Sequence, residues 1–289
     1  MITSRISTAC ALLLLTLPAL AQAEGKAALT YGYDQNGYRS FAFKGDIDFT
    51  KDYILDLDHL HAESSGTVSM RQSGVGLTAY ATDWLSGHYR YSETNDTIFL
   101  VAGNEGDISV ALNPLWDSKL KTKLSGGYAN FAYKNANPPT NGSNRTFNQT
   151  RRNYSLSQDI TSSFNVYAGY DEYTYDINLG TVVLLLARRA RFSAANSFLS
   201  FPETTRSAGI TWKATEKLTF DISSSKTLTM FNQDQISSRL GFDYQFTDAL
   251  NIGLAVTRST STSLIRPNGV VIQPESDTTF NEVTASWYF

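Results

Sequence analysis

The chain has 289 residues, with 24 lysines and arginines against 27 aspartates and glutamates and a formal net charge of −3. A charge this close to balance excludes a basic protein that binds nucleic acid through its phosphates. Tyrosine and phenylalanine are abundant, with 16 of each.

The N-terminal residues 1–23 have the three parts of a secretory signal peptide. Arg5 supplies the positive charge, Ala9–Leu20 an apolar core, and Ala21-Gln22-Ala23 a cleavage site of small residues. We expect cleavage after Ala23, which leaves 24–289 as the mature domain. The only cysteine, Cys10, lies in the signal, so the exported domain is expected to contain no disulfide.

Downstream of the signal, no apolar run approaches the roughly 20 residues of a membrane helix. The nearest, 182–187, is followed at once by two arginines. If the chain enters a membrane, it must do so as a closed β-barrel, because only helices and barrels satisfy every backbone polar group in lipid.

From Leu29 onward the dominant pattern is alternation of apolar and polar residues, which is typical of strands with one apolar face. Five segments repeat an apolar residue, a threonine, two turn residues and a second apolar residue. They are FTKDY (Phe49–Tyr53), ATDWL (Ala81–Leu85), ITSSF (Ile160–Phe164), ATEKL (Ala214–Leu218) and FTDAL (Phe246–Leu250). Each predicts a hairpin with a three-residue loop.

These turns predict the register of the strands beside them. Trp212 is expected opposite Phe220, and Leu77 opposite Tyr89, so that apolar residues meet. The turn FTKDY likewise places Asp46 opposite Asp56 and Lys44 opposite Asp58. Each turn therefore predicts which residues of its two strands lie opposite one another.

A sixth, longer turn, Leu112–Leu120, completes the series. Longer connections rich in Gly, Asn, Ser and Pro separate the six turns, near Asn36, Ser65, Asn95, Pro138, 180–202, Asn232 and Pro267. Seven long connections and six short turns predict an all-β, antiparallel, up-and-down transmembrane barrel of about 14 strands, with 12 or 16 as alternatives. A soluble β-sandwich also alternates and remains the alternative fold.

The chain ends in FNEVTASWYF, whose apolar face consists of Val283, Ala285, Trp287 and Phe289. This stretch resembles the C-terminal signal of bacterial outer-membrane proteins, an alternating strand that ends in phenylalanine and is recognised by the β-barrel assembly machinery. The resemblance covers 280–289 closely and 24–289 in general pattern, and monomeric fourteen-stranded porins are similar in strand count. It implies a bacterial outer-membrane location, with outer-membrane lipid, lipopolysaccharide and the assembly machinery as partners.

Three histidines are the candidates for catalysis or metal binding. His59 and His61 share a face with Leu55 and Leu57, whereas His88 is predicted on the lumen side. Phospholipase, deacylase and protease barrels carry His with Ser or Asp, but neighbouring Asp and His side chains of a flat strand point to opposite faces. We therefore expect that the protein is not an enzyme and binds no metal or cofactor. We interpret His59 and His61 as aromatic residues at the membrane interface.

The stretch LLLARRARF (Leu184–Phe192) breaks the alternation within the longest connection. Three interpretations stay open. The first is a surface hairpin or short helix whose arginines face lipopolysaccharide. The second is a loop folded into the mouth, with a constriction built from Arg188, Arg189 and Arg191. The third is two more strands of the barrel, which would make sixteen.

Alternation places charged residues of both signs toward the lumen. Those expected to line a pore are Lys44, Asp46, Asp48, Asp56, Asp58, Arg90, Lys121, Lys123, Asp171, Lys213, Asp221, Arg239 and Asp243; Asp107 and Asp159 share this parity. Such charges are costly in a membrane unless they face water or one another. They suit either a wet channel or a barrel plugged by salt bridges.

The leading hypothesis is a channel for passive diffusion of small hydrophilic solutes, a porin without a cofactor. An excess of carboxylates around Asp46 and Asp56 predicts weak cation preference, unless Lys44 neutralises them. The alternatives are a surface barrel that acts as adhesin, phage receptor or export accessory, and a rim-site outer-membrane hydrolase.

Overall fold

The computed structural model describes residues 24–64, 67–112, 120–136, 146–179, 201–265 and 271–289. The signal peptide expected at 1–23 and the LLLARRARF stretch lie outside the described residues. Within the described ranges, no helix is both long enough and apolar enough to cross a membrane.

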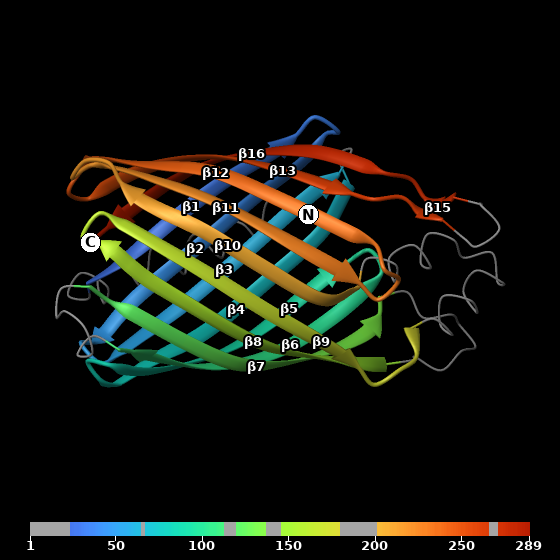
Figure 1. Ribbon diagram of the computed structural model, residues 1–289, viewed down its shortest axis with the longest axis horizontal. Helices are drawn as coiled ribbons and strands as arrows, with labels where there is room; N and C mark the ends of the chain where they lie inside the picture. Colours follow the sequence, from blue (N-terminus) through green and yellow to red (C-terminus); the bar gives the residue numbers. More distant parts are fainter. Residues whose placement is uncertain (1–23, 65–66, 113–119, 137–145, 180–200, 266–270) are drawn as a thin grey trace, which may run out of the picture.

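Fourteen strands form one closed antiparallel barrel, in which each strand pairs with the strands before and after it (Figure 1). They are β1 (Glu24–Asp34), β2 (Tyr38–Thr50), β3 (Tyr53–Ser64), β4 (Thr67–Thr82), β5 (Leu85–Asp96), β6 (Phe99–Ala111), β7 (Thr122–Asn135), β8 (Thr146–Thr161), β9 (Phe164–Tyr175), β10 (Pro202–Lys213), β11 (Leu218–Thr229), β12 (Asp234–Thr247), β13 (Leu250–Ser261) and β16 (Ser276–Tyr288). The predicted fold class and strand number are confirmed.

Two further short strands, β14 (Leu264–Ile265) and β15 (Val271–Gln273), form a separate two-stranded sheet beyond one end of the barrel (Figure 1). The barrel wall contains no strand between β9 and β10, because these two pair directly from Thr204↔Glu172 to Trp212↔Phe164. The alternatives of 12 or 16 barrel strands are therefore excluded.

The threonine common to the five repeated turns has a local role. In each turn its hydroxyl accepts a hydrogen bond from the backbone N–H two residues later. The pairs are Thr50–Asp52 at 3.2 Å, Thr82–Trp84 at 3.3 Å, Thr161–Ser163 at 3.2 Å, Thr215–Lys217 at 3.2 Å and Thr247–Ala249 at 3.3 Å. This bond satisfies a backbone donor where the strand ladder stops and favours the turn.

The loops differ from the expected three residues. In four of the five turns the threonine itself pairs across the hairpin, as in Thr50↔Tyr53, next to an irregularity in the register. A β-bulge beside the turn absorbs the extra residue. The predicted register of the strands is unaffected, and Asp46↔Asp56, Trp212↔Phe220 and Leu77↔Tyr89 are all observed.

Each strand presents one face outward and one to the lumen. The outward face carries large apolar side chains that remain exposed, such as Ile108 at 60% and Phe246 at 61%. A sandwich would bury such residues between two sheets. A continuous exposed apolar surface instead requires an apolar surrounding, as a lipid-facing barrel has.

A cluster of buried apolar residues lies at the end of the barrel opposite the short turns. Phe99, Phe147, Leu179 and Phe201 are nearly inaccessible, and Tyr133 packs among them. The rings of Tyr133 and Phe147 stack at 4.7 Å between centroids. By parity these residues of β6, β7 and β8 lie on the inward face, so the cluster narrows one side of that mouth.

The C-terminal strand closes the barrel. Residues of β16 pair with β1 from Lys26↔Tyr288 to Asp34↔Phe280, and on its other edge β16 pairs with β13. The last rung joins Gly25 and Phe289 by two backbone hydrogen bonds, of 2.9 and 3.1 Å. The final residue therefore takes part in removing the edge of the sheet.

We predict that deletion of Phe289, or replacement of Trp287 and Phe289 by serine, prevents assembly. The deletion removes both hydrogen bonds to Gly25 and the end of the apolar face that the assembly machinery is expected to read. Heat-modifiable electrophoretic mobility of outer-membrane fractions measures the result. Phe246→Ser, which also removes an exposed aromatic side chain, is the control and should retain the folded band. A normal folded band for the Phe289 deletion would contradict the prediction.

Candidate functional site

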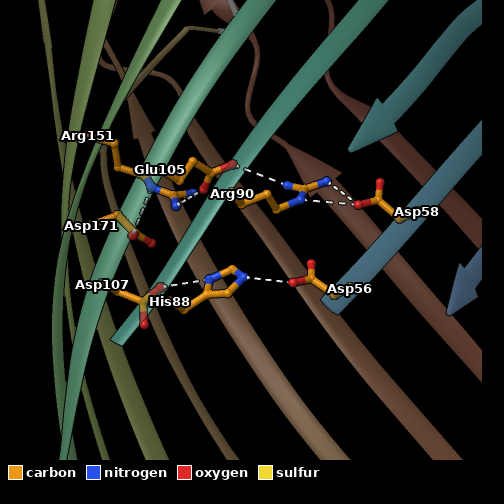
Figure 2. A network of polar contacts seen from close by, with 8 residues as sticks. All are labelled: Asp56, Asp58, His88, Arg90, Glu105, Asp107, Arg151 and Asp171. Carbon is orange, nitrogen blue, oxygen red and sulfur yellow. Dashed lines mark hydrogen bonds and ion pairs between the residues drawn. The ribbon is translucent and has the colours of Figure 1, made fainter. Parts of the chain in front are cut away.

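A row of alternating charges crosses the inward face of neighbouring strands at about half their length. We call it the charged ladder: Asp58, Arg90, Glu105, Arg151 and Asp171, from β3, β5, β6, β8 and β9 (Figure 2). Successive members are joined at 2.7 Å, 3.2 Å, 2.6 Å and 4.0 Å between nitrogen and oxygen. Each guanidinium thus lies between two carboxylates.

A shorter row lies beside the ladder, on the side of the short turns. His88 on β5 contacts Asp56 on β3 through Nε2 and Asp107 on β6 through Nδ1, each at 3.2 Å (Figure 2). We call these three residues the histidine row. Together the ladder and the row contain five carboxylates, two guanidiniums and one imidazole.

Glycines make these long-range contacts possible. Asp58 and Arg90 reach one another across β4, where Gly74 lies between them. A Cβ atom at Gly74 would be 2.5 Å from Oδ1 of Asp58 and 2.6 Å from Nη2 of Arg90. Gly76 occupies the equivalent position beside Asp56. A side chain at either position would occupy the space that the ion pairs use.

The strand between Glu105 and Arg151 is also built from small residues on its inward face. Ala129 of β7, which pairs with both Glu105 and Arg151, is completely buried beneath them. One rung nearer the short turns, a Cβ atom on Gly127 would lie 2.8 Å from the backbone oxygen of Gly106. The inner wall therefore forms a shallow trough in which the charged side chains lie.

Asp221 and Arg239, two further lumen charges, have partners nearby. Asp221 accepts hydrogen bonds from Tyr167 at 3.1 Å and Thr211 at 3.1 Å. Arg239 forms an ion pair with Glu282. Among the described residues, every ion pair between two strands joins neighbouring strands or strands separated by one other. The described ion pairs therefore follow the wall and do not cross the lumen.

In the described strands, Lys44 does not neutralise the carboxylates around Asp46 through an ion pair. The register Lys44↔Asp58 is as predicted, but Asp58 is engaged by Arg90. In the part of the chain that the structure describes, Lys44, Asp46 and Asp48 take part in no ion pair within 4.0 Å. The expected neutralising pair is therefore absent from the described contacts.

The residues expected to line the lumen fall on the inward parity of their strands. These are Lys44, Asp46, Asp48, Asp56, Asp58, Arg90, Lys123, Asp171, Lys213, Asp221, Arg239 and Asp243. Lys121 lies just outside β7, where its N–H donates to Asp159. Arg188, Arg189 and Arg191 lie outside the described residues.

Charged residues of the inner wall that escaped the sequence prediction include Lys26, Glu105, Arg151 and Glu282. Glu105 has the same parity as Asp107, and Arg151 the same parity as Asp159. Parity alone could therefore have placed both. Their pairing could not have been found that way, because Glu105 and Arg151 contact one another over an intervening strand.

The outward face carries one contact of chemical interest. Nδ1 of His59 and Oγ of Ser73 are 2.9 Å apart, on adjacent strands β3 and β4. His61 contacts Glu63 at 3.0 Å on the same face. A triad would need a further group that orients the His59 ring, and the described contacts show none at its other nitrogen. Within the described ranges, no group of three or more His, Cys, Asp or Glu could hold a metal ion.

The fold defines a class of protein, the closed antiparallel β-barrel with an apolar exterior and a polar, charged interior. No protein-family model matches the sequence, and no curated protein matches it.

Solved structures of similar architecture include outer-membrane porins and channels. The KdgM porin is 9% identical, with a TM-score of 0.45, over 91% of this chain and 99% of that chain. OccK3 (OpdO) of Pseudomonas aeruginosa is 10% identical, with a TM-score of 0.47, over 94% and 97%. The outer membrane channel DcaP of Acinetobacter baumannii is 6% identical, with a TM-score of 0.46, over 93% and 96%. Identities this low say nothing about the solute or the residues that select it.

We predict that Gly127→Ala destabilises the barrel by about 1–3 kcal/mol, because its methyl group would meet backbone on the neighbouring strand. The adjacent Gly126 is the matched control, since a Cβ atom there would have no neighbour closer than 3.9 Å. Gly126→Ala should change stability by no more than about 0.5 kcal/mol. Urea unfolding of the folded protein in lipid vesicles measures both. Equal stability of the two variants would show that the trough is not closely packed.

Proposed function

We propose that the protein is an outer-membrane channel for passive diffusion of small hydrophilic solutes, with weak cation preference. The observation that carries the proposal is the direction of the ion pairs on the inner face. Those that are described run along the wall from strand to strand. A barrel sealed by salt bridges would need pairs that join opposite walls.

The location proposed is the bacterial outer membrane. The exposed apolar and aromatic side chains on the outward face support it, because such a surface suits lipid. The terminal strand supports it as well, since its apolar parity reaches Phe289. Outer-membrane lipid, lipopolysaccharide and the β-barrel assembly machinery are accordingly the proposed partners.

The proposed cation preference rests on the balance of charge in the charged ladder and the histidine row. The charged ladder and the histidine row hold five carboxylates against two guanidiniums, with His88 between two of the acids. Asp46 and Asp48, on the adjacent β2, add carboxylates without a described ion pair. A wall with excess negative charge concentrates cations at low ionic strength.

We predict conductance in planar bilayers, with a reversal potential that indicates preference for potassium over chloride. Asp46→Asn combined with Asp56→Asn should lower the permeability ratio about fourfold, about twofold for each charge removed from the lumen. Glu172→Gln, which removes a carboxylate from the outward face of β9, is the control and should leave the ratio unchanged. A clear anion preference of the unmodified protein would refute the preference proposed here. Absence of conductance would refute the channel.

The contact between His59 and Ser73 gives the hydrolase alternative a specific test. A hydroxyl beside an imidazole on the outward face could act on a lipid ester. Phospholipid vesicles containing the purified protein should release no fatty acid. Release that disappears in Ser73→Ala would overturn this expectation and favour the enzyme.

A further inference from the structure

His88 occupies an unusual position on the inner wall of the barrel. Its two ring nitrogens face carboxylate oxygens on opposite sides, Oδ2 of Asp56 and Oδ2 of Asp107, each at 3.2 Å. Figure 2 shows the ring lying between the two acids, with Asp56 coming from β3 and Asp107 from β6. The three side chains are thus arranged nearly in a line along the wall.

The hydrogen-bonding capacity of imidazole limits what this arrangement can be. An ionised carboxylate only accepts hydrogen bonds, and a neutral imidazole has a single N–H to donate. Both contacts of His88 are therefore hydrogen bonds only when the ring is doubly protonated. A neutral ring can bond one of the two carboxylates and leaves the other facing an unprotonated nitrogen.

The charged groups nearest to this triplet are arranged as follows. On β3 and β6 the next inward acids are Asp58 and Glu105, and both are engaged by Arg90, the next inward residue of β5. The strands beside His88 and Asp107 supply no titratable group at the level of the row: β4 presents Gly76 and Thr78, and β7 presents Gly127. At the other end of the row, β2 presents Asp46 opposite Asp56. Asp56 and Asp107 are the charges in direct contact with His88.

The row is also in contact with water. The side chain of His88 is 27% exposed, that of Asp56 17% and that of Asp107 34%. A proton can therefore exchange with solution in the lumen, and the charge of the row acts on ions that pass. With His88 protonated the three residues carry a charge of −1, and with His88 neutral they carry −2.

We propose that His88 is a specificity-determining residue, whose protonation sets the strength of the cation preference. This inference rests on the proposed channel function. Imidazoles change charge between about pH 5 and pH 8. Loss of the proton strengthens the preference for cations, because the row loses a positive charge and one carboxylate loses its hydrogen bond.

The test is the reversal potential of the full-length mature protein in a potassium chloride gradient, in a zwitterionic lipid bilayer, at pH 5.5 and pH 8. The cation-to-anion permeability ratio of the unmodified protein should rise about twofold, the enrichment expected from one more unit charge across about 8 Å of water. His88→Gln should show the high ratio at both pH values, since glutamine stays neutral. His88→Lys should show the low ratio at both.

His61→Gln is the matched control, because His61 contacts Glu63 on the outward face and should leave the rise intact. Heat-modifiable mobility establishes that each variant is folded. An equal rise in the unmodified protein and in His88→Gln would overturn the role of His88 while leaving the channel in place. Absence of conductance in every folded variant would overturn both.

Discussion

Closure of the backbone hydrogen-bond ladder is the constraint on which the rest of this structure depends. Fourteen strands pair around a complete circle, and the circle is completed only where β16 meets β1. In lipid an unpaired strand edge would expose backbone groups that have no water to bond. The pairing of β16 with β1, and the two hydrogen bonds between Phe289 and Gly25, satisfy this need.

Closure of the barrel also determines which face of each strand can carry polar side chains. Because side chains alternate, each strand must send one set outward and the other into a confined lumen. The outward set is apolar and exposed, whereas the inward set is charged and paired along the wall. The ion pairs that reach across a strand need a small residue on that strand, and Gly74, Gly76 and Ala129 meet that need. The small residues and the charges are thus parts of one arrangement.

The two ends of the barrel are built differently. At one end, short turns are stabilised by a threonine hydroxyl that bonds the backbone two residues later. At the other, Phe99, Phe147 and Phe201 bury one another inside the mouth. A solute that entered there would pass an aromatic surface before it reached the charged ladder. The chain runs up and down the wall, and this path sets the order of the aromatic surface and the charged ladder along the barrel axis.

Much of this could be predicted from the sequence alone, because the evidence is local. Alternation and the repeated threonine turn indicate strand number, register and which residues face inward, and Asp46↔Asp56 is an example. What the tertiary structure decided is which inward charges meet. Asp58 pairs with Arg90 rather than with its register partner Lys44, because Gly74 leaves room for a contact across β4. His88 likewise lies between Asp56 and Asp107, residues 32 and 19 positions away. Asp107 is the register partner of His88 on the neighbouring strand, but the contacts of Asp56 with His88 and of Asp58 with Arg90 reach across β4. No periodicity in the chain encodes that reach.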